Sequence, residues 1–488
     1  MKKHDLCALL GIPAPAGPDF SFTHVTEDSR RVRPGSLFVA VQGEKQDGHT
    51  YATQAVSQGA TAIIGDDTTL HELAGVPYLP VTVPRRAAGI IAHALLDNPS
   101  HAMTVIGITG TNGKGCSAYL TRAILDQAGF LTANFGTLGY HIGDTTYHAD
   151  HTTPFGEDLA EMFGKARDAG VSHLVMEASS HALDQERVAG VRFNVGAFTN
   201  LTQDHLDHHG TMDAYCQAKL KLFQRLEGAS AFGAVNADDP AGERFRQAAS
   251  VPCSTYGEKG DCAASDIRMT AQGTRFRLKT PWGEGPVALH LVGEHNVYNA
   301  LCAVAICGGL GVKFTDIVEG LQTLKAVPGR FETVATGQSF QVIVDYAHTE
   351  DGLRNVLRAA RKICPGRLIT LFGCGGDRDK TKRPKMGAVA AELSDFVVLT
   401  SDNPRTEDPL RILLDAEVGL QRSGRHKDDD YIVLSDRTEA IYRAVALARK
   451  GDVVMLAGKG HEDYQILGTT KIHFDDREVA RKALEALC

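Results

Sequence analysis

Residues 103–117 read MTVIGITGTNGKGCS, and this stretch decides how the middle of the chain folds. Met103–Thr109 is short, apolar and rich in β-branched residues, which is typical of a buried strand in a parallel sheet. A glycine-rich turn, Gly110–Gly113, follows, and Lys114–Gln127 has the composition of a helix. Glycines let backbone N–H groups surround a phosphate, and a lysine at the helix start can neutralise it. The stretch therefore predicts a nucleotide-phosphate site formed by Gly110, Thr111, Asn112, Gly113, Lys114, Gly115 and Cys116.

The loop departs from a standard phosphate loop at the metal position. Gly115 stands where Ser or Thr normally supplies a hydroxyl ligand to Mg²⁺. Cys116 is a poor ligand for a hard cation. Ser117 can take that role only if the loop has a different geometry, so the sequence leaves the metal ligand of this loop open.

Short apolar strands recur along the rest of the chain, with helical stretches between several of them. Strands of this kind are expected at His173–Glu177, Val195–Thr199, Phe232–Asn236, Val342–Asp345, Leu368–Phe372, Phe396–Thr400 and Val453–Ala457. This alternation predicts an α/β fold with a central parallel sheet of the phosphate-loop type and a second doubly wound sheet near the C-terminus. In such sheets, ligands bind beyond the carboxyl ends of the strands.

Two polar breaks divide the chain. They lie at Asn98-Pro99-Ser100 and at Val327-Pro328-Gly329-Arg330. A length of 488 residues suggests about three domains at roughly 150 residues each. We therefore expect domains at residues 1–98, 99–330 and 331–488, called the first, second and third segments below.

Composition excludes several classes of protein. With 51 basic and 59 acidic residues the net charge is −8, which argues against a general binder of nucleic acid or of an anionic membrane. The 10 cysteines show no CxxC pair and no regular spacing, as expected for reduced thiols of the cytoplasm. No apolar run reaches the roughly 20 residues that span a bilayer. We expect a cytoplasmic protein with no membrane partner.

Two strand ends in the second segment carry groups that suit a metal ion. Glu177 ends one predicted strand, and a histidine-rich loop containing His205 follows another. A carboxylate and imidazoles beside a phosphate loop suit a divalent cation that bridges phosphates. On the next helix, Lys219 falls on the apolar stripe of Tyr215 and Phe223. A buried ammonium is costly unless it is paired or chemically changed, although a lysine that reaches solvent is the simpler alternative.

Charged loops also follow four predicted strands of the third segment. These loops are Asp345-Tyr346-Ala347-His348, Gly373–Lys380, Ser401–Arg405 and Gly458–Asp463. Together they predict a crevice rim with both signs of charge, which suits a zwitterionic ligand that carries several carboxylates and amines.

These motifs, taken together, resemble the Mur ligases, the ATP-dependent amide ligases of peptidoglycan synthesis. The resemblance covers nearly the whole chain and includes Asp28-Ser29-Arg30, Thr109–Lys114, Glu177–His181, Asp204–Asp207, Ala218-Lys219, Asp345–His348 and Gly373–Arg378. Asp402-Asn403-Pro404-Arg405 resembles the signature of those members that add meso-2,6-diaminopimelate. The resemblance implies three domains, the third of them Rossmann-like, and roles in cell-wall biogenesis, cell shape and cell division.

The resemblance also implies a role for each matching position. Lys114, Glu177, His205 and Lys219 would be catalytic, with Mg²⁺ held by Glu177, His205 and a carbamylated Lys219. ATP would also contact Asn296, Arg330 and Asp345. The substrate UDP-N-acetylmuramoyl-L-alanyl-D-glutamate would bind Ser29, Glu44, Lys45, Gln46, Thr152, Thr153, Ser179, Gln185 and Arg187. Diaminopimelate would bind Arg378, Asp402, Asn403, Pro404, Arg405, Gly458 and Glu462.

Gly115 departs from the family pattern, which has Thr there, and keeps alternatives open. Folylpolyglutamate synthetases are similar in placing Gly after the lysine, so a ligase of that type is one rival. A second is a phosphate-loop hydrolase or switch without a ligase step. A third is a homologue that binds the UDP-peptide but has an impaired centre. We expect a monomer that uses Mg²⁺ and ATP and follows the ligase mechanism, in which an acyl phosphate forms before the amide.

Overall fold

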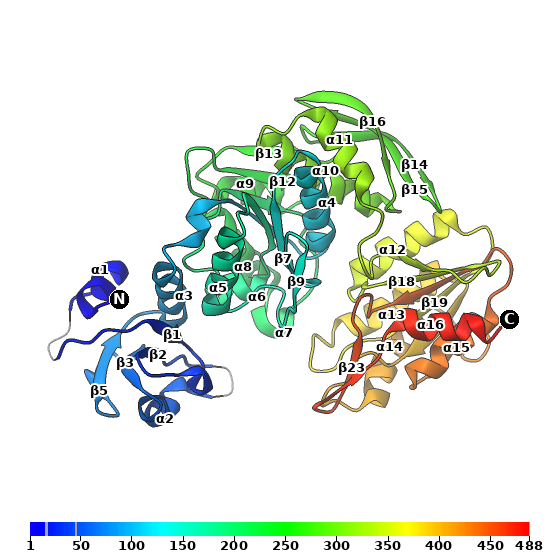
Figure 1. Ribbon diagram of the computed structural model, residues 1–488. Helices are drawn as coiled ribbons and strands as arrows, with labels where there is room; N and C mark the ends of the chain where they lie inside the picture. The colour runs from blue at the N-terminus through cyan, green and yellow to red at the C-terminus, as the bar shows by residue number, and fades with distance from the viewer. Residues whose placement is uncertain (15–17, 44–45, 488) are drawn as a thin grey trace.

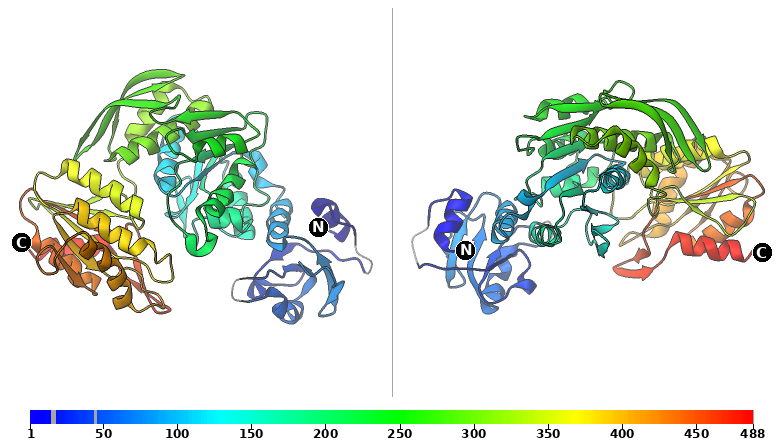
Figure 2. Two further views of the ribbon diagram at one scale, coloured as in Figure 1. Left: turned by 180° about the vertical axis from the view of Figure 1, so that it is seen from behind. Right: turned by 45° about the horizontal axis from the view of Figure 1, so that its top comes forward.

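The computed structural model describes residues 1–14, 18–43 and 46–487, and each predicted segment carries one main sheet. The first and third segments lie on either side of the second (Figure 1), and the two further views agree (Figure 2). The α/β class and the central parallel sheet are confirmed. That the segments are separate domains with boundaries at 98/99 and 330/331 stays a prediction. No helix in the described part of the chain is long and apolar enough to cross a membrane.

The first segment has a five-stranded sheet in the order β1-β2-β3-β5-β4, parallel except for β4. Apolar side chains from this sheet and from the helices form its core, for example Leu37 and Ile91. The strands are β1 (His24–Thr26), β2 (Ser36–Val39), β3 (Ala60–Gly65), β4 (Glu72–Leu73) and β5 (Val76–Pro80). The helices are α1 (Lys3–Leu10), α2 (Ala52–Ser57) and α3 (Pro84–Leu95), with short 3₁₀ turns at Ser29–Arg31 and Gly48–Tyr51. A third 3₁₀ turn, Pro99–Ala102, begins the second segment.

The second segment is built on an eight-stranded sheet in the order β13-β12-β11-β6-β10-β7-β8-β9. Its strands are β6 (Thr104–Thr109), β7 (Thr132–Gly136), β8 (Gly139–Ile142), β9 (Thr145–Tyr147), β10 (His173–Glu177), β11 (Val195–Phe198), β12 (Phe232–Asn236) and β13 (Cys253–Tyr256). All pairs are parallel except β7–β8 and β8–β9, an antiparallel edge that the sequence did not predict. A three-stranded antiparallel sheet, β14 (Ala263–Thr270), β15 (Gly273–Thr280) and β16 (Gly283–Leu289), follows.

Helices cover both faces of the central sheet. One core contains side chains of α4 (Lys114–Gln127), α10 (Glu294–Gly309) and α11 (Phe314–Thr323). The opposite core contains side chains of α5 (Gly156–Asp168), α6 (Ser180–Asp184), α8 (Met212–Phe223) and α9 (Gly242–Ala248). The four-residue α7 (Leu206–His209) precedes α8. Because the sheet is covered on both sides, its parallel strands read as continuous apolar runs.

The third segment has a six-stranded sheet in the order β17-β18-β22-β19-β20-β21. Its strands are β17 (Glu332–Val334), β18 (Gln341–Asp345), β19 (Leu368–Phe372), β20 (Phe396–Thr400), β21 (Tyr431–Leu434) and β22 (Val453–Ala457), and only β17 is antiparallel. One face packs on α12 (Glu350–Ile363), α13 (Lys382–Leu393) and α14 (Pro409–Arg422). The other packs on α15 (Arg437–Leu447) and α16 (Asp476–Glu485). A hairpin of β23 (Tyr464–Leu467) and β24 (Thr470–His473) lies before α16.

Candidate active site

The predicted phosphate loop joins β6 to α4 at the centre of the sheet. Strand β6 pairs in parallel with β10 on one side and β11 on the other, so the carboxyl ends of all three strands meet around the loop. Gly110 and Gly113 have φ of +147° and +86°, values that glycine adopts without strain. A Cβ on Gly110 would lie 1.8 Å from Oγ1 of Thr199, so no side chain fits there.

Lys114 lies folded over this loop. Its Nζ donates hydrogen bonds to the carbonyl oxygens of Gly110 (3.0 Å) and Thr111 (2.9 Å). Burial lowers the pKa of the Lys114 amine. The amine therefore lies on the loop, beside the backbone N–H groups that are expected to hold a phosphate.

Glu177 is 4% exposed at the end of β10, next to the start of α4. Its Oε1 accepts a hydrogen bond from the backbone N–H of Thr137 (2.9 Å). A Cβ on Gly115 would lie 3.4 Å from the same Oε1, at ordinary contact distance. The position that departs from the family pattern therefore faces the carboxylate predicted to bind Mg²⁺, and it has room for a Cβ.

Ser117 points away from that carboxylate. It is fully buried, and its Oγ lies 3.4 Å from Oδ1 of Asn299 on α10. The Ser117 hydroxyl therefore faces α10. The structure gives no support to Ser117 as a substitute for the missing hydroxyl at Gly115.

Lys219 is buried on α8, as its place in the apolar stripe predicts, and is only 1% exposed. Its Nζ donates to the carbonyl oxygen of Gly110 (2.7 Å) and lies 4.3 Å from the centre of the Tyr215 ring. Burial, and next the nearby Lys114 charge, lower the pKa of the Lys219 amine well below its usual value. A neutral amine is the form that reacts with carbon dioxide, so this environment fits the predicted carbamylation.

His205 precedes α7 in a left-handed conformation with φ of +54°. Burial lowers the pKa of its imidazole to about 2, so the ring is neutral, as a metal ligand must be. Its Nε2 lies 3.4 Å from Oδ2 of Asp204. A carboxylate beside a ligating imidazole fixes the orientation of the ring. Glu177, His205 and a carbamylated Lys219 together fit a hard divalent cation, whereas an unmodified Lys219 would repel it.

A cavity of about 390 Å³ opens beside the phosphate loop. The predicted ATP contacts Asn112, Gly113, Cys116, Asn296, Arg330 and Asp345 all line it. Arg330 lies over the Tyr346 ring, 4.7 Å from its centre. Asp345 accepts hydrogen bonds from the backbone N–H groups of Phe331 (2.7 Å) and Ala347 (2.8 Å), and burial raises the pKa of its carboxyl. The phosphate loop, the start of α10 and the region around β18 therefore meet at this cavity, although they are far apart in the sequence.

A second cavity, of about 710 Å³, lies in the first segment against α5. Ser29 and Gln46 line it, together with Arg30 and Arg31. Glu44 and Lys45, also predicted to contact the UDP part, fall outside the described residues. The opening of α5 contributes Glu157 and Asp158 to the same wall, so both the first and second segments form this cavity.

The residues predicted to hold the peptide end form one hydrogen-bonded group behind Glu177. Thr153 Oγ1 donates to the carbonyl oxygen of Glu177 (2.7 Å) and accepts from the backbone N–H of Ser179 (3.2 Å). Arg187 donates to the carbonyl oxygen of Thr153 (3.2 Å) and to Oε1 of Gln185 (2.7 Å). The remaining member, Thr152, lies 3.0 Å from the Thr137 hydroxyl. The group thus links the predicted peptide contacts to the predicted metal ligand.

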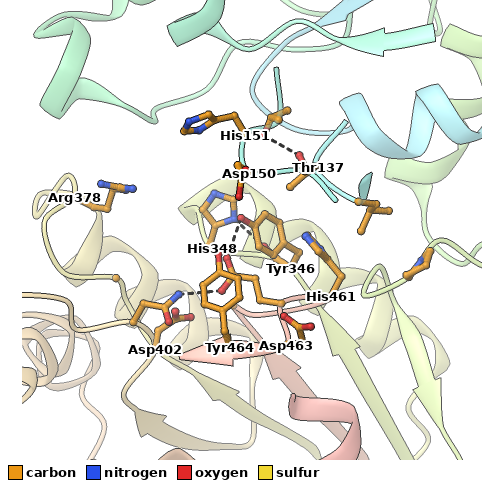
Figure 3. A pocket seen from close by; sticks show the side chains of 18 of the residues that line it. Thr137, Asp150, His151, Tyr346, His348, Arg378, Asp402, His461, Asp463 and Tyr464 are labelled. Carbon is orange, nitrogen blue, oxygen red and sulfur yellow. Dashed lines mark hydrogen bonds between the residues drawn. The ribbon is translucent and has the colours of Figure 1, made fainter. Parts of the chain in front are cut away.

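The third cavity, of about 620 Å³, lies between the second and third segments (Figure 3). Thr137, Thr152 and His205 of the second segment line it. From the third segment it takes Arg378, Asp402, Asn403, Arg405, Gly458 and Glu462, which all belong to the predicted diaminopimelate contacts. Pro404, also predicted, is buried next to them but does not line the cavity.

Charges in this cavity are arranged in opposing pairs. Glu462 accepts hydrogen bonds from Asn403 (2.9 Å) and from Lys459 (3.1 Å). Burial, and next the charge of Asp402, raise the pKa of the Glu462 carboxyl. Although burial acts to raise the pKa of Asp402, the Lys459 and Arg437 cations outweigh it and hold that pKa below its usual range. Arg405 lies at the rim, where its guanidinium donates to the carbonyl oxygen of Gly376 (2.8 Å).

Three charged or polar residues in or beside this cavity have no separate prediction from the sequence. Lys459 is fully buried against Glu462. Its position in the charged loop after β22 is the sequence feature that could have indicated a role in this site. Lys382 lies 3.4 Å from Oδ1 of Asp204, which joins α13 to the loop before α7. Tyr346 lines both this cavity and the one beside the phosphate loop. Lys382 sits in a run of charged residues that looks like an ordinary solvated surface.

Three consecutive parts of the chain match described sequence families. Residues 21–95 match "Mur ligase family, catalytic domain", and residues 108–307 match "Mur ligase middle domain". Residues 329–460 match "Mur ligase, glutamate ligase domain".

Similar proteins align with nearly the whole chain. A UDP-N-acetylmuramoyl-L-alanyl-D-glutamate--2,6-diaminopimelate ligase of Bacillus licheniformis is 45% identical over 488 residues, covering 98% of both chains. The protein of the same name from Geobacillus thermodenitrificans is 46% identical over 465 residues, 94% of both chains. A solved structure described by that name is 31% identical, covers 99% of both chains and has a TM-score of 0.69.

Proposed function

The chain belongs to the Mur ligase family, and from that premise we propose that it joins meso-2,6-diaminopimelate to UDP-N-acetylmuramoyl-L-alanyl-D-glutamate in peptidoglycan synthesis, at the expense of ATP. The relatives that carry this name match the chain over almost its full length. One observation carries the proposal furthest. The cavity between the second and third segments brings together the predicted peptide contact Thr152, the predicted metal ligand His205 and the predicted diaminopimelate contacts.

A carboxylate is a poor electrophile, so the reaction requires activation. A carboxylate of the dipeptide attacks the γ-phosphorus of ATP, which forms an acyl phosphate and releases ADP. The amine of diaminopimelate then attacks the acyl carbon, and the tetrahedral intermediate expels inorganic phosphate and a proton. Positioning and charge neutralisation do most of the work in phosphoryl transfer.

The residues of the chain divide this work. Lys114 would neutralise phosphate oxygens, and the loop N–H groups would hold them. Glu177, His205 and a carbamylated Lys219 would hold Mg²⁺, which when bound neutralises further phosphate charge. Tyr346, which lines both the nucleotide cavity and the amino-acid cavity, would separate the two reactants from bulk water.

Specificity for diaminopimelate over lysine requires a cation, because diaminopimelate carries one more carboxylate. Arg405 would grip that carboxylate with two parallel hydrogen bonds, and Asn403 and Glu462 would orient the distal amine. Burial, and next the Arg378 charge, lower the pKa of the Arg405 guanidinium, which means that its charged form is poorly solvated. A bound carboxylate would therefore stabilise the charged guanidinium. We further propose that the protein works as a cytoplasmic monomer.

The decisive experiment is a phosphate-release assay with ATP, Mg²⁺ and the UDP-dipeptide, run with diaminopimelate, lysine or glutamate. We expect release only with the dipeptide present, and fastest with diaminopimelate. ATP turnover without the dipeptide would indicate a hydrolase, and use of a folate with glutamate would indicate a folylpolyglutamate-type ligase. Binding of the UDP-dipeptide without phosphate release would identify a homologue impaired at Gly115.

The Arg405→Ala variant tests the specificity assignment. We expect kcat/KM for diaminopimelate to fall by an amount equivalent to about 2–5 kcal/mol, the usual cost of removing one partner of a buried hydrogen-bonded charge pair. The KM for ATP should stay unchanged. Arg411→Ala, an exposed arginine on α14, is the matched control and should behave as the parent protein. An Arg405→Ala enzyme that keeps its KM for diaminopimelate and loses ATP binding would contradict the assignment.

A further inference from the structure

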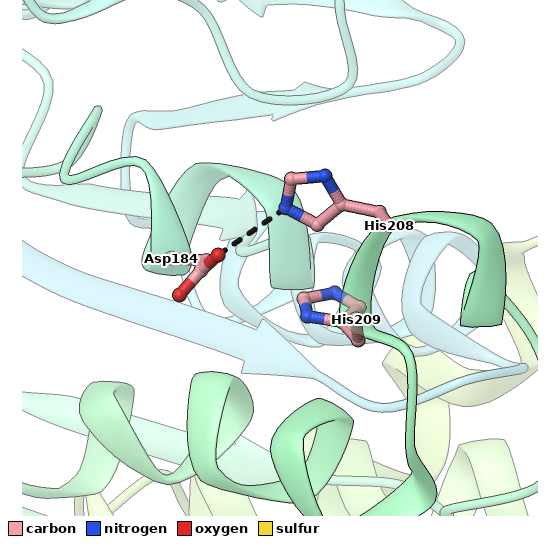
Figure 4. Close-up of side chains that lie close together, drawn as sticks. All are labelled: Asp184, His208 and His209. Carbon is pink, nitrogen blue, oxygen red and sulfur yellow. Dashed lines mark hydrogen bonds and ion pairs between the residues drawn. The ribbon is translucent and has the colours of Figure 1, made fainter. Parts of the chain in front are cut away.

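Three side chains that the ligase mechanism does not use lie close together beside the active site. Asp184 is the last residue of α6, and His208 and His209 end α7 (Figure 4). One donor atom from each of the three residues lies within 4.8 Å of the others. The Asp184 Oδ2 and His208 Nε2 atoms are 3.2 Å apart. Two helices that are separate in the sequence thus present one carboxylate and two imidazoles to a common point.

The donors match the preference of a transition-metal dication rather than that of Mg²⁺. Zinc takes imidazole and carboxylate ligands at about 2.0–2.1 Å in tetrahedral sites, which places neighbouring donors about 3.3 Å apart. The Asp184–His208 pair already has that spacing.

The neighbouring groups resemble the outer shell of a metal site. His209 Nε2 lies 3.0 Å from the Ser180 hydroxyl. Partners of this kind orient ligating imidazoles. Lys221 Nζ lies 3.1 Å from Oδ1 of Asp184, the oxygen that His208 does not contact. This ammonium can orient the carboxylate, but its charge weakens the binding of any cation.

We propose that Asp184, His208 and His209 form a binding site for a transition-metal dication of the Zn²⁺ type, with water as the remaining ligand. The site would link α6 to α7. Because α7 is only four residues long and begins directly after His205, the bound ion would hold the turn that positions a residue of the active site. The proposal does not depend on the ligase activity.

Equilibrium dialysis against Zn²⁺ tests the site, with the untagged protein in excess Mg²⁺ and total metal measured afterwards. We expect one equivalent of zinc on the parent protein, and affinity at least about tenfold weaker in Asp184→Asn and in His208→Ala. Zinc should raise the unfolding midpoint of the parent and not of these variants, because a ligand that binds only the native state stabilises it. Their unfolding midpoints without zinc show whether they fold.

Three further variants make the result specific. Lys221→Met should bind zinc about threefold tighter or more, because it removes a repelling charge from the carboxylate. Glu177→Gln should keep its zinc, since Glu177 belongs to the predicted Mg²⁺ site. His148→Ala removes the histidine of an exposed His148–Asp150 pair and should leave the zinc affinity unchanged. Zinc that survives His208→Ala, or is lost in Glu177→Gln, would overturn the proposal, as would a Lys221→Met protein with unchanged affinity.

Discussion

At the scale of single residues, Lys219 shows how burial changes the chemistry of a side chain. Lys219 is only 1% exposed. Its amine donates a hydrogen bond to the carbonyl oxygen of Gly110, and among the described residues no carboxylate lies within hydrogen-bond distance of it. Burial lowers its pKa, which favours the neutral amine. A carbamate on this amine would exchange repulsion from Lys114 for attraction and would add an oxygen ligand for Mg²⁺.

Lys219→Ala should therefore lower ligase activity by about 100-fold or more. Replacing even a residue that only supports a metal ligand typically lowers metal affinity or activity by about 10–100-fold. Short carboxylates added to the assay should restore part of the activity by filling the vacated position. In the parent protein, labelling with ¹³C-bicarbonate should give a carbamate signal. Lys221→Ala on the same helix is the control and should remain active. A fully active Lys219→Ala protein would remove the hypothesis.

Gly115 is the second residue whose chemistry can be tested alone. Because its Cβ position lies 3.4 Å from Oε1 of Glu177, Gly115→Thr would bring a hydroxyl close to the predicted metal ligand. We expect kcat/KM for ATP to rise by about fivefold, the equivalent of roughly 1 kcal/mol for one added polar contact. The Mg²⁺ concentration for half-maximal rate should fall.

Ser117→Ala is the matched variant for this test. Its hydroxyl faces Asn299 on α10, so we expect an unchanged Mg²⁺ dependence. A loss of turnover in Ser117→Ala, with no gain in Gly115→Thr, would mean that Ser117 is the metal ligand after all. No change in either variant would mean that this loop does not set metal affinity.

At the scale of elements, the close approach of α3 and α5 connects the first segment to the second. Gly89 of α3 and Gly156 of α5 face each other, and a Cβ on Gly156 would lie 2.7 Å from the Gly89 Cα. A Cβ on Gly89 would lie 2.5 Å from the carbonyl oxygen of Ala189. These contacts involve backbone atoms, which cannot move aside cheaply.

Gly89→Ala should therefore destabilise the protein by about 1–3 kcal/mol, as overpacking usually does, despite the better helix propensity of alanine. Gly164→Ala in α5 is the matched change, because its Cβ would lie 3.6 Å from Leu96 at ordinary contact distance. There we expect stabilisation of about 0.5–1 kcal/mol from helix propensity alone. Thermal unfolding of both variants measures the contrast, and equal shifts of the same sign would contradict it.

At the scale of the whole molecule, polar contacts join the three segments. Thr26 of the first segment donates a hydrogen bond to Oε1 of Glu157 in the second (3.2 Å). Asn112 of the phosphate loop donates to Asp351 of the third (2.9 Å). Lys382 of the third segment pairs with Asp204 of the second at the cavity of about 620 Å³. Polar contacts are therefore one part of the interfaces between the segments, beside the close packing of α3 on α5.

Glu157 makes the first of these interfaces sensitive to pH. Burial raises the pKa of its carboxyl to about 7, although Arg31 acts to lower it, and its Oε2 is buried without a hydrogen-bond partner. Because the native pKa lies above the unfolded value near 4.5, the unfolded state loses its proton first as pH rises. Glu157 therefore costs stability progressively from about pH 4.5 to 7, and the cost is constant above that.

Glu157→Gln should raise the free energy of unfolding by roughly 1–3 kcal/mol above pH 7 and by much less at pH 5. Unfolding midpoints at pH 5 and 8.5 measure this difference. Glu161→Gln, one turn further along α5 and with an exposed side chain, is the control and should show no such pH dependence. A Glu157→Gln variant that is less stable than the parent at pH 8.5 would show that the native carboxyl is ionised and paired.

Strands β7 and β15 are absent from the elements that the sequence predicts, for different reasons. Thr132–Gly136 reads TANFG and lacks the apolar run that marks β6 and β10. The antiparallel β15 did carry a signal, since the buried Phe276 and Leu278 alternate with the exposed Arg275 and Arg277, the two-residue period of a half-buried strand. Strand β15 is absent from the predicted strands because all of those are continuous apolar runs, and β15 alternates apolar and charged residues.

The sequence by itself determined most of the parallel strands of the second and third segments, the phosphate loop and the buried position of Lys219. The predicted strands are β6, β10, β11, β12, β18, β19, β20 and β22. These features depend on local patterns, because a strand buried on both faces must be apolar and a phosphate loop must be rich in glycine. Parallel pairing then brings successive strand ends to one edge, which is why most predicted site residues lie around three cavities.

Only the tertiary structure decided which residues meet across the segments and what each buried charge faces. The pairs Lys382–Asp204 and Thr26–Glu157 join positions more than 100 residues apart. The cluster of Asp184, His208 and His209 arises because α6 follows β10 and α7 follows β11, the two strands on either side of β6. Such contacts depend on how packed elements are oriented, and a side chain's own neighbours in the sequence carry no record of that orientation.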